Sequence, residues 1–166
     1  MLKLLYIYER TFKVDKDKIT LVFDKWCKKL RLIPDWDIKL QWVTDKNWPK
    51  TGDIKIDCCD KKAIVLLNET NPKQENLEEV VAHELMHLKM YPLDQFTEGL
   101  ILSTFKENTS ARDFAYRGFF ETLEQTVEEL TKCFLLEFGE NRELSFGRCQ
   151  RGKSFTELYD GLNNLE

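Results

Sequence analysis

Hydrophobic and polar residues follow one another along this chain in patterns that predict a helix and then strands in its first half. Apolar residues recur every three or four positions over residues 15–32, which indicates an amphipathic helix. Pro34 follows and suits the end of that helix. Residues 36–43 and 52–58 alternate apolar with polar side chains, which predicts two half-buried strands. Residues 63–68 form a short continuous apolar run, which favours a strand covered on both faces.

The second half of the chain has mainly helical patterns. Asn76 and Glu79 form a capping-box pattern in front of an apolar-periodic stretch. That helix is expected to end at about residue 90, because Pro92 disfavours helix in the residue before it. Residues 93–109 are then predicted as a loop or short helices, long enough to act as a lid or plug.

Two further helices are expected towards the C-terminus. Residues 110–138 predict a long helix, in which Gly118 marks the position where a break could occur. Gly139 suits the end of this helix, since glycine is common just past a helix C-terminus. Residues 154–162 predict one more short helix.

The length and composition are those of one ordinary globular domain. The chain has 166 residues, of which 42% are hydrophobic and 33% are charged, enough apolar residues for a sizeable core. No repeat or Gly/Ser linker divides it. We therefore expect a single domain over residues 1–166, with its core at about residues 15–138 and a C-terminal tail at residues 139–166.

Charge, hydropathy and cysteine usage argue against several functional classes. The formal net charge is −4 and no block of Lys or Arg occurs, which argues against nucleic-acid binding. No apolar run is long enough to cross a bilayer, and the first residues lack the features of a signal peptide. The five cysteines contain no CxxC pair, so free thiols are expected. We expect a cytoplasmic protein that binds neither nucleic acid nor a membrane.

The stretch AHELMHL contains both histidines of the chain, His83 and His87, four residues apart on the predicted helix. Residues at this spacing lie on one helical face, so both imidazoles can bind the same cation. Glu84 follows the first histidine and can hold a water molecule beside that cation. This is the HExxH arrangement of zinc metallopeptidases, which predicts one Zn²⁺ per chain.

A third protein ligand cannot be a histidine, because none is left in the chain. The predicted long helix offers carboxylates beside its apolar stripe of Phe120, Leu123, Val127, Leu130 and Phe134. Glu124 and Glu128 flank that stripe one turn apart, Glu121 precedes them by a turn, and Glu129 points towards solvent. We predict Glu124 as the ligand and Glu128 as the hydrogen-bond partner of a ligating histidine. Glu128 or Glu121 as the ligand, and more remotely Cys133, remain alternatives.

With HELMH and a later Glu124-x-x-x-Glu128, the chain resembles the gluzincin branch of the zincin metallopeptidases, which use HExxH and a glutamate on a later helix. It is similar in size to minimal gluzincins and to ImmA/IrrE-like peptidase domains of phages and bacteria. The resemblance covers about residues 36–138. It implies a zincin-like α+β fold with an N-terminal helix, a small mixed three-stranded sheet, the HExxH helix and a long helix carrying the glutamate. It also implies an edge strand that pairs with an extended peptide, for which residues 63–68 are the candidate.

The predicted activity is hydrolysis of a peptide bond in a peptide or protein substrate. Glu84 would act as general base on a zinc-bound water and then pass the proton to the leaving amine. A donor to the oxyanion is also expected, and four residues are candidates: Tyr91, Arg112, Tyr116 and Arg117. Tyr116 is preferred because it lies about two turns before Glu124 on the same predicted helix.

Two other functional classes are compatible with the same motif. The domain could bind zinc without catalysis, as a regulatory or interaction domain whose site is closed by a fourth ligand such as Cys58, Cys59 or Cys133. It could also be an interaction protein that binds no metal. The presence of Glu84 favours the enzyme, since a closed zinc site needs no base.

Overall fold

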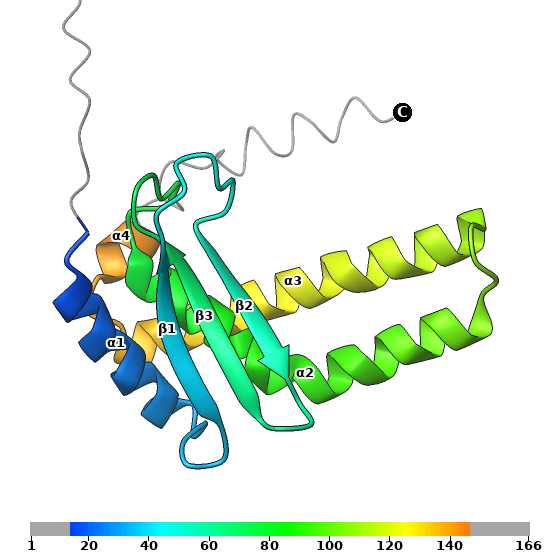
Figure 1. Ribbon diagram of the computed structural model, residues 1–166, viewed down its shortest axis with the longest axis horizontal. Helices are drawn as coiled ribbons and strands as arrows, with labels where there is room; N and C mark the ends of the chain where they lie inside the picture. Colours follow the sequence, from blue (N-terminus) through cyan, green and yellow to red (C-terminus); the bar gives the residue numbers. More distant parts are fainter. Residues whose placement is uncertain (1–13, 147–166) are drawn as a thin grey trace, which may run out of the picture.

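The computed structural model describes residues 14–146, which form a mixed α+β domain with four helices and a three-stranded sheet (Figure 1). In chain order the elements are α1 Lys16–Lys29, β1 Asp37–Val43, β2 Gly52–Asp57, β3 Lys62–Asn68, α2 Leu77–Thr104, α3 Ser110–Phe138 and α4 Arg142–Phe146. The α+β class and the small mixed sheet expected from the sequence are thus confirmed. The helix predicted over residues 154–162 lies outside the described residues.

The sheet has the strand order β1-β3-β2, with β1 parallel and β2 antiparallel to β3. Val65 of β3 pairs with Leu40 of β1 on one side and with Ile54 of β2 on the other. The expectation that residues 63–68 form the edge strand beside the site is therefore wrong. Residues 63–68 occupy the centre of the sheet, where both neighbouring strands pair with their backbone. β1 and β2 are the edge strands, and β2 is the one that lines the site.

One face of the sheet packs on the helices and the other faces outward (Figure 1). Ala63, Val65 and Leu67 of β3 are buried against α1 and α2, whereas Ile64 between them is 37% exposed. The prediction of a strand covered on both faces is therefore wrong, because within residues 14–146 helices cover only one side of the sheet. The apolar run reflects the central position of β3 rather than a second layer.

Helix α2 is much longer than its sequence pattern predicts. It continues through Pro92 to Thr104. The expected loop over residues 93–109 is therefore helical as far as Thr104, and only residues 105–109 connect α2 to α3. Proline removes one backbone donor from a helix interior and disfavours an isolated helix. Here α3 runs antiparallel along α2 and buries Ile101, and this packing offsets the cost. Helix α3 is continuous across Gly118, where no break occurs.

The paired α2 and α3 extend well beyond the sheet as a helical hairpin (Figure 1). Helix α2 contacts the sheet, α1 and α3, and in Figure 1 its second half runs beside α3 away from the sheet. Nothing described therefore folds over the hairpin as the predicted lid would. Among residues 14–146, no helix combines the length and apolarity needed to cross a bilayer.

A buried carboxylate that sequence reasoning missed fixes the start of α2. Glu78 is fully buried, and its Oε1 accepts hydrogen bonds from Lys25 Nζ at 3.0 Å and Trp26 Nε1 at 3.1 Å. Its Oε2 accepts from the backbone N–H of Glu140 at 2.8 Å and of Asn141 at 3.3 Å. Glu78 thereby ties α2 to α1 and to the segment after α3, and sets how the two site helices lie against each other.

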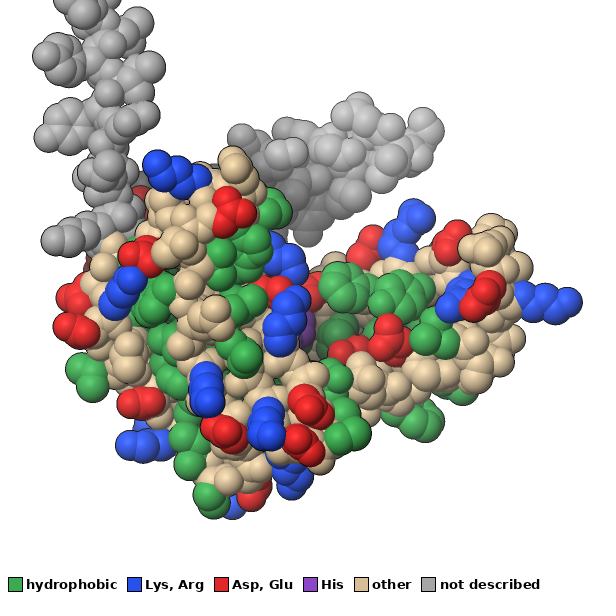
Figure 2. All heavy atoms as spheres, viewed as in Figure 1, with side chains coloured by type: hydrophobic (Ala, Val, Ile, Leu, Met, Phe, Trp, Pro, Cys, Tyr) green, Lys and Arg blue, Asp and Glu red, His purple; other side chains and the backbone are tan. Residues whose placement is uncertain are grey.

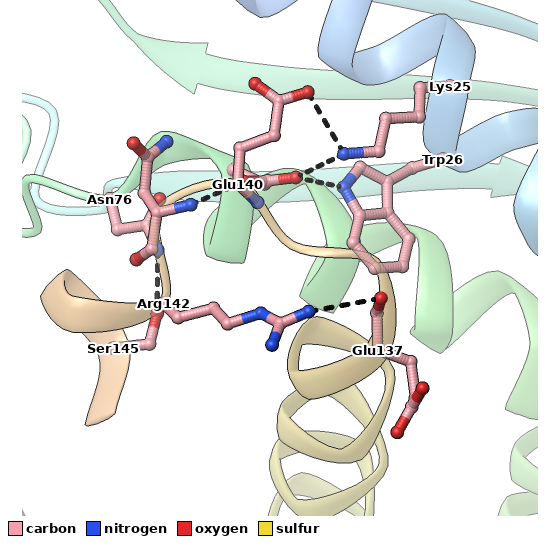
Figure 3. A network of polar contacts seen from close by, with 9 residues as sticks. Lys25, Trp26, Asn76, Glu137, Glu140, Arg142 and Ser145 are labelled. Carbon is pink, nitrogen blue, oxygen red and sulfur yellow. Dashed lines mark hydrogen bonds and ion pairs between the residues drawn. The ribbon is translucent and has the colours of Figure 1, made fainter.

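The predicted capping box does not form. The Asn76 side chain does not bond the first turn of α2; its Nδ2 donates to Ser145 Oγ at 2.7 Å and to Asn141 O at 3.4 Å. The Glu79 carboxylate accepts a hydrogen bond from the same Ser145 hydroxyl. Figure 3 shows Asn76 pointing to Ser145 while Lys25 reaches towards Glu140. Both capping-box residues are thus drawn into contacts with α4, which the local sequence pattern cannot reveal.

Candidate metal centre

The two histidines of α2 face α3 because the rest of the helix is anchored in the core. Leu77, Val81, Leu85 and Leu88 are buried, as the helical periodicity predicts. His83 and His87 lie on the neighbouring face and are only partly buried, with side-chain exposures of 21% and 17%. Their rings meet edge to face, with centroids 4.9 Å apart. The packing of the apolar face thus fixes where the imidazoles point.

Glu124 of α3 completes a group of three potential ligands with the two histidines. The Nε2 atoms of His83 and His87 lie 3.2 Å apart. The Glu124 carboxylate lies 3.6 Å from His83 Nε2 and 3.3 Å from His87 Nε2. The structure therefore brings together the three residues that the sequence analysis selected as ligands.

These separations suit a tetrahedral zinc ion. Bonds of about 2.0–2.1 Å at tetrahedral angles separate neighbouring ligand atoms by roughly 3.3 Å. The two Nε2 atoms lie 3.2 Å apart and Glu124 Oε1 lies 3.3 Å from His87 Nε2, both close to that value. The other carboxylate oxygen, Oε2, lies 3.6 Å from His83 Nε2, and one ligand atom from each residue lies within 4.8 Å of the other two. Two imidazoles and one carboxylate are also the ligand set of several catalytic zinc sites, which keep a fourth position open. The residues present therefore fit Zn²⁺ in both geometry and chemistry.

Glu128 lies one turn after Glu124 and contacts the other nitrogen of a candidate ligand. His83 Nδ1 donates to Glu128 Oε2 at 3.3 Å, and Lys132 Nζ lies 2.7 Å from Glu128 Oε1. A proton on Nδ1 leaves the lone pair of Nε2 available for a metal, so this contact selects the ligating tautomer. Although burial opposes it, the hydrogen bond and charge of Lys132 hold the pKa of Glu128 below its usual range.

The charges around the histidines favour a cation. Burial by itself lowers the pKa of His83, but the hydrogen bond to Glu124 and the charges of Glu84, Glu124 and Glu128 outweigh it and raise that pKa. The hydrogen bond with His83 holds the pKa of Glu124 below its usual range. Burial lowers the pKa of His87, which favours its neutral form. The negative field that favours a proton on His83 favours a metal cation in its place.

The Glu84 side chain lies beside this group and points from α2 towards Gly52, the first residue of β2. An ideal Cβ placed on Gly52 would lie 2.9 Å from Glu84 Oε1 and 2.4 Å from Val80 Cγ1, so only glycine fits this close approach. Burial raises the pKa of Glu84 to about 7, and the charges of Asp53 and Glu124 add to the shift while His83 opposes it. A carboxyl group in this range can both take and return a proton near neutral pH.

A cleft of about 550 Å³ opens in front of these residues. One wall is the edge strand β2, and the other comes from α2 and α3. Its lining residues include both histidines and Glu84 together with Gly52, Asp53, Ile54, Lys55, Ile56, Tyr91, Asp94, Phe120 and Glu124. Figure 2 shows the histidine surface in purple at this boundary between the sheet and the paired helices. The candidate metal centre is thus accessible from solvent along a free strand edge.

Of the four candidate oxyanion donors, Tyr91 lines the cleft, whereas Arg112, Tyr116 and Arg117 line a neighbouring groove. Tyr116 does not reach the cleft: its hydroxyl donates to Glu98 Oε1 at 3.0 Å, and its side chain lines a neighbouring groove with Arg112 and Arg117. The preference for Tyr116 as oxyanion donor therefore has no support in the geometry. Tyr91 does line the cleft, one turn after His87. Nothing in the sequence favoured Tyr91 as the oxyanion donor, because Pro92 predicted that the helix ends at about residue 90.

The predicted apolar stripe of α3 is only partly buried, and the cysteines proposed as alternative ligands lie away from the histidines. Leu123 and Val127 are buried as predicted, but Phe120 is 51% exposed, because α3 passes the edge of the sheet there. Cys58, Cys59 and Cys133 are exposed free thiols, and none belongs to the group of potential ligands found among residues 14–146. Gly52 and Asp53 were missed, since only the pairing of β2 with β3 brings them to the histidines.

Comparison of the chain with protein-family models, with curated proteins and with solved structures finds no match. The chemistry of this site therefore rests on its own residues and geometry.

Proposed function

We propose that this protein is a zinc-dependent metallopeptidase of gluzincin-like type that hydrolyses a peptide bond in the cleft between β2 and the α2–α3 pair. The observation that carries the proposal is the convergence of His83, His87 and Glu124 within 4.8 Å of one another, with the half-buried Glu84 beside them. The free edge of β2 forms the opposite wall of the cleft and offers backbone groups to an extended peptide.

Each side chain of the site has its own role in the proposed reaction. Zn²⁺ bound at this centre would polarise a carbonyl group and acidify water. Glu84, whose pKa is raised to about 7, takes a proton from the attacking water and later delivers it to the amine that leaves. Glu128 keeps the His83 imidazole in one tautomer and orientation. Tyr91 lines the cleft one turn beyond His87 and contacts the Cys58 side chain. When a substrate displaces that contact, the Tyr91 hydroxyl can donate to the carbonyl oxygen of the substrate.

A non-catalytic zinc domain of the same fold is the alternative. Such a site is closed by four protein ligands, whereas the described residues supply three within 4.8 Å of one another. The raised pKa of Glu84 and the adjoining cleft are features that a purely structural site would not use. These observations favour the enzyme.

The test combines zinc content with peptidase activity on protein purified without a metal-affinity tag. Wild type should contain about one zinc per chain, and Glu124→Ala should lose most of it, since three ligands hold the ion. Glu121→Ala is the matched control, because Glu121 is exposed on the same helix and lies outside the ligand group. Glu84→Gln should keep zinc and lose activity. Full zinc in every variant, or zinc without any hydrolysis by wild type, would contradict the proposal.

A further inference from the structure

The cleft continues into a second groove that runs along the helical hairpin. This groove has a volume of about 690 Å³ and is lined by Glu98, Leu102, Arg112, Asp113, Tyr116, Arg117, Phe120 and Glu121. Phe120 lines both the cleft and the groove, so the two share a wall. Figure 2 shows hydrophobic side chains gathered over α3 beside the purple histidine surface. The candidate site is therefore one end of a longer surface.

Three large hydrophobic side chains along this groove are uncovered. Leu102 is 43%, Tyr116 40% and Phe120 51% exposed, although each is large. The hydrogen bond from Tyr116 OH to Glu98 Oε1 joins α3 to α2 across the groove and holds the Tyr116 ring in place. Exposed apolar side chains that share a groove indicate a binding surface rather than ordinary surface residues. The occupant should therefore offer apolar groups.

The charges in the groove do not select an ion. Arg112 and Arg117 face Glu98, Asp113 and Glu121 among the lining residues, so positive and negative groups are mixed. In the cleft, Asp53 is likewise paired with Lys50 at 2.9 Å and with Lys55 at 2.7 Å. Affinity should therefore come from apolar contact, with a weak dependence on salt.

The length of this surface sets the size of the occupant. Glu124 and Arg112 are twelve positions apart on α3, which is about 18 Å at a rise of 1.5 Å per residue. An extended chain of about five residues spans that distance at roughly 3.3 Å per residue. A dipeptide or a single free amino acid would leave the groove empty. The geometry points to an extended polypeptide segment with bulky apolar side chains as the substrate, seated on Leu102, Tyr116 and Phe120 to one side of the cleaved bond.

This inference rests on the proposed peptidase function, because the segment is assigned to the same cleft. It specifies the substrate class: an unfolded or extended stretch of protein, read over about five residues beyond the site by apolar contact. In this interpretation, the part of the α2–α3 hairpin beyond the sheet binds the substrate.

The test measures binding separately from hydrolysis. The probe is a fluorescein-labelled peptide of about twelve residues, long enough for cleft and groove, with leucine at every second position. The comparison probes are the same peptide with alanine for each leucine and a truncation to about four residues. Binding to zinc-loaded Glu84→Gln protein is followed by anisotropy. We expect the leucine peptide to bind at least about tenfold more tightly than either comparison probe, and about equally at low and high salt.

Variants then locate the binding surface. Phe120→Ala and Leu102→Ala, each in the Glu84→Gln background, should weaken binding of the leucine peptide about tenfold. Phe114→Ala is the matched control, because Phe114 is 80% exposed on the same helix but lines neither the cleft nor the groove. Equal weakening by Phe114→Ala and Phe120→Ala, or no preference for the leucine peptide, would overturn the inference.

The two proposals fail in different ways. If wild type hydrolyses peptides but Phe120→Ala and Leu102→Ala leave the affinity for the leucine peptide unchanged, the groove assignment is wrong and the enzyme assignment stands. If the leucine peptide binds through Phe120 but zinc-loaded wild type cleaves nothing, the surface is a peptide-binding groove and the catalytic assignment is wrong.

Discussion

His83 Nδ1 donates to the carboxylate of Glu128 at 3.3 Å, while Nε2 of the same ring faces His87 and Glu124. A single imidazole thus connects the candidate ligand group to a carboxylate behind it, and Lys132 in turn contacts that carboxylate. Such outer partners fix ring orientation and raise ligand basicity. The contact therefore predicts a measurable contribution of Glu128 to zinc affinity.

Replacing Glu128 with Ala should weaken zinc binding by about 10–100-fold without abolishing it. Competition against a chromogenic chelator at fixed pH would give the affinity. Glu129→Ala is the matched control, since its side chain is exposed and the structure shows no contact of it with the site. An affinity unchanged in Glu128→Ala would mean that the contact with His83 does not support the metal centre.

The contact of Gly52 with Glu84 predicts an effect on catalysis that is separate from zinc binding. In Gly52→Ala the new methyl group must displace the Glu84 carboxylate or Val80, because the ideal Cβ lies 2.9 Å and 2.4 Å from them. Misplacing a catalytic group by about 1 Å can reduce the rate about 100-fold. We expect kcat to fall about 10–100-fold while zinc content stays near one per chain.

Gly118→Ala is the control for this substitution. A Cβ on Gly118 meets nothing within 4 Å, and Gly118 lies inside α3. Alanine there should leave activity unchanged and stabilise the protein by about 0.5–1 kcal/mol, because alanine is the better helix former. Full activity in Gly52→Ala would show that the Glu84 carboxylate adapts or is not the base.

Tyr91 and Tyr116 give opposite predictions for the loss of a hydroxyl group. Tyr91→Phe should lower kcat about 100-fold with little change in KM, if its hydroxyl donates to the oxyanion in the cleft. Tyr116→Phe should leave kcat within about twofold, because Tyr116 OH donates to Glu98 outside the cleft. Steady-state kinetics on one peptide substrate would separate them. The reverse pattern would restore the preference that the sequence alone suggested.

Glu78 predicts a contribution to stability that depends on pH. Burial opposes its ionisation, but hydrogen bonds from the Glu140 backbone, Lys25 and Trp26 outweigh it and hold the pKa of Glu78 below the usual value of 4.5. Since the folded-state pKa lies below the unfolded one, the stabilisation is present above that usual value and is lost as pH falls through the folded-state pKa.

Glu78→Gln should therefore lower the free energy of unfolding at neutral pH by about 1.5–3 kcal/mol, because two backbone N–H groups and Lys25 lose a charged acceptor while Lys25 keeps its contact with Glu140. Urea denaturation at neutral and acidic pH would measure it, and the variant should lose less stability than wild type on acidification. Glu137→Gln is the control, since Glu137 is exposed at the C-terminal end of α3, close in sequence to the Glu140 backbone that bonds Glu78. A variant that loses stability in parallel with wild type would exclude Glu78 as the source.

Removal of zinc should leave the fold intact. The core is built from apolar residues of α1, the sheet, α2 and α3, and does not include the three candidate ligands. Circular dichroism should show unchanged helicity after chelation. Zinc at about 100 times its dissociation constant should then restore about 2.7 kcal/mol of stability, measured as an increase in Tm. Loss of helical signal on chelation would instead indicate a structural zinc site.

The sequence by itself predicted which side chains meet at the candidate site and the class of the fold. Two histidines one turn apart can share a cation wherever the helix lies, because the spacing is local to α2. The same is true of Glu124 and Glu128, whose separation by one turn let one face the ligand group and the other the back of His83. Local periodicity also selected the core face of α2, from Leu77 to Leu88.

Only the tertiary structure decided the rest, because those features depend on contacts between distant segments. Helix α2 passes Pro92 because α3 packs along it, although proline disfavours the helix locally. Strand β3 is central and β2 lines the cleft because of pairing order, which no single strand encodes. No local pattern marks Glu78 as a buried residue, yet α1 and the segment after α3 both bond its carboxylate at the start of α2. Phe120 is uncovered because the sheet ends where α3 continues.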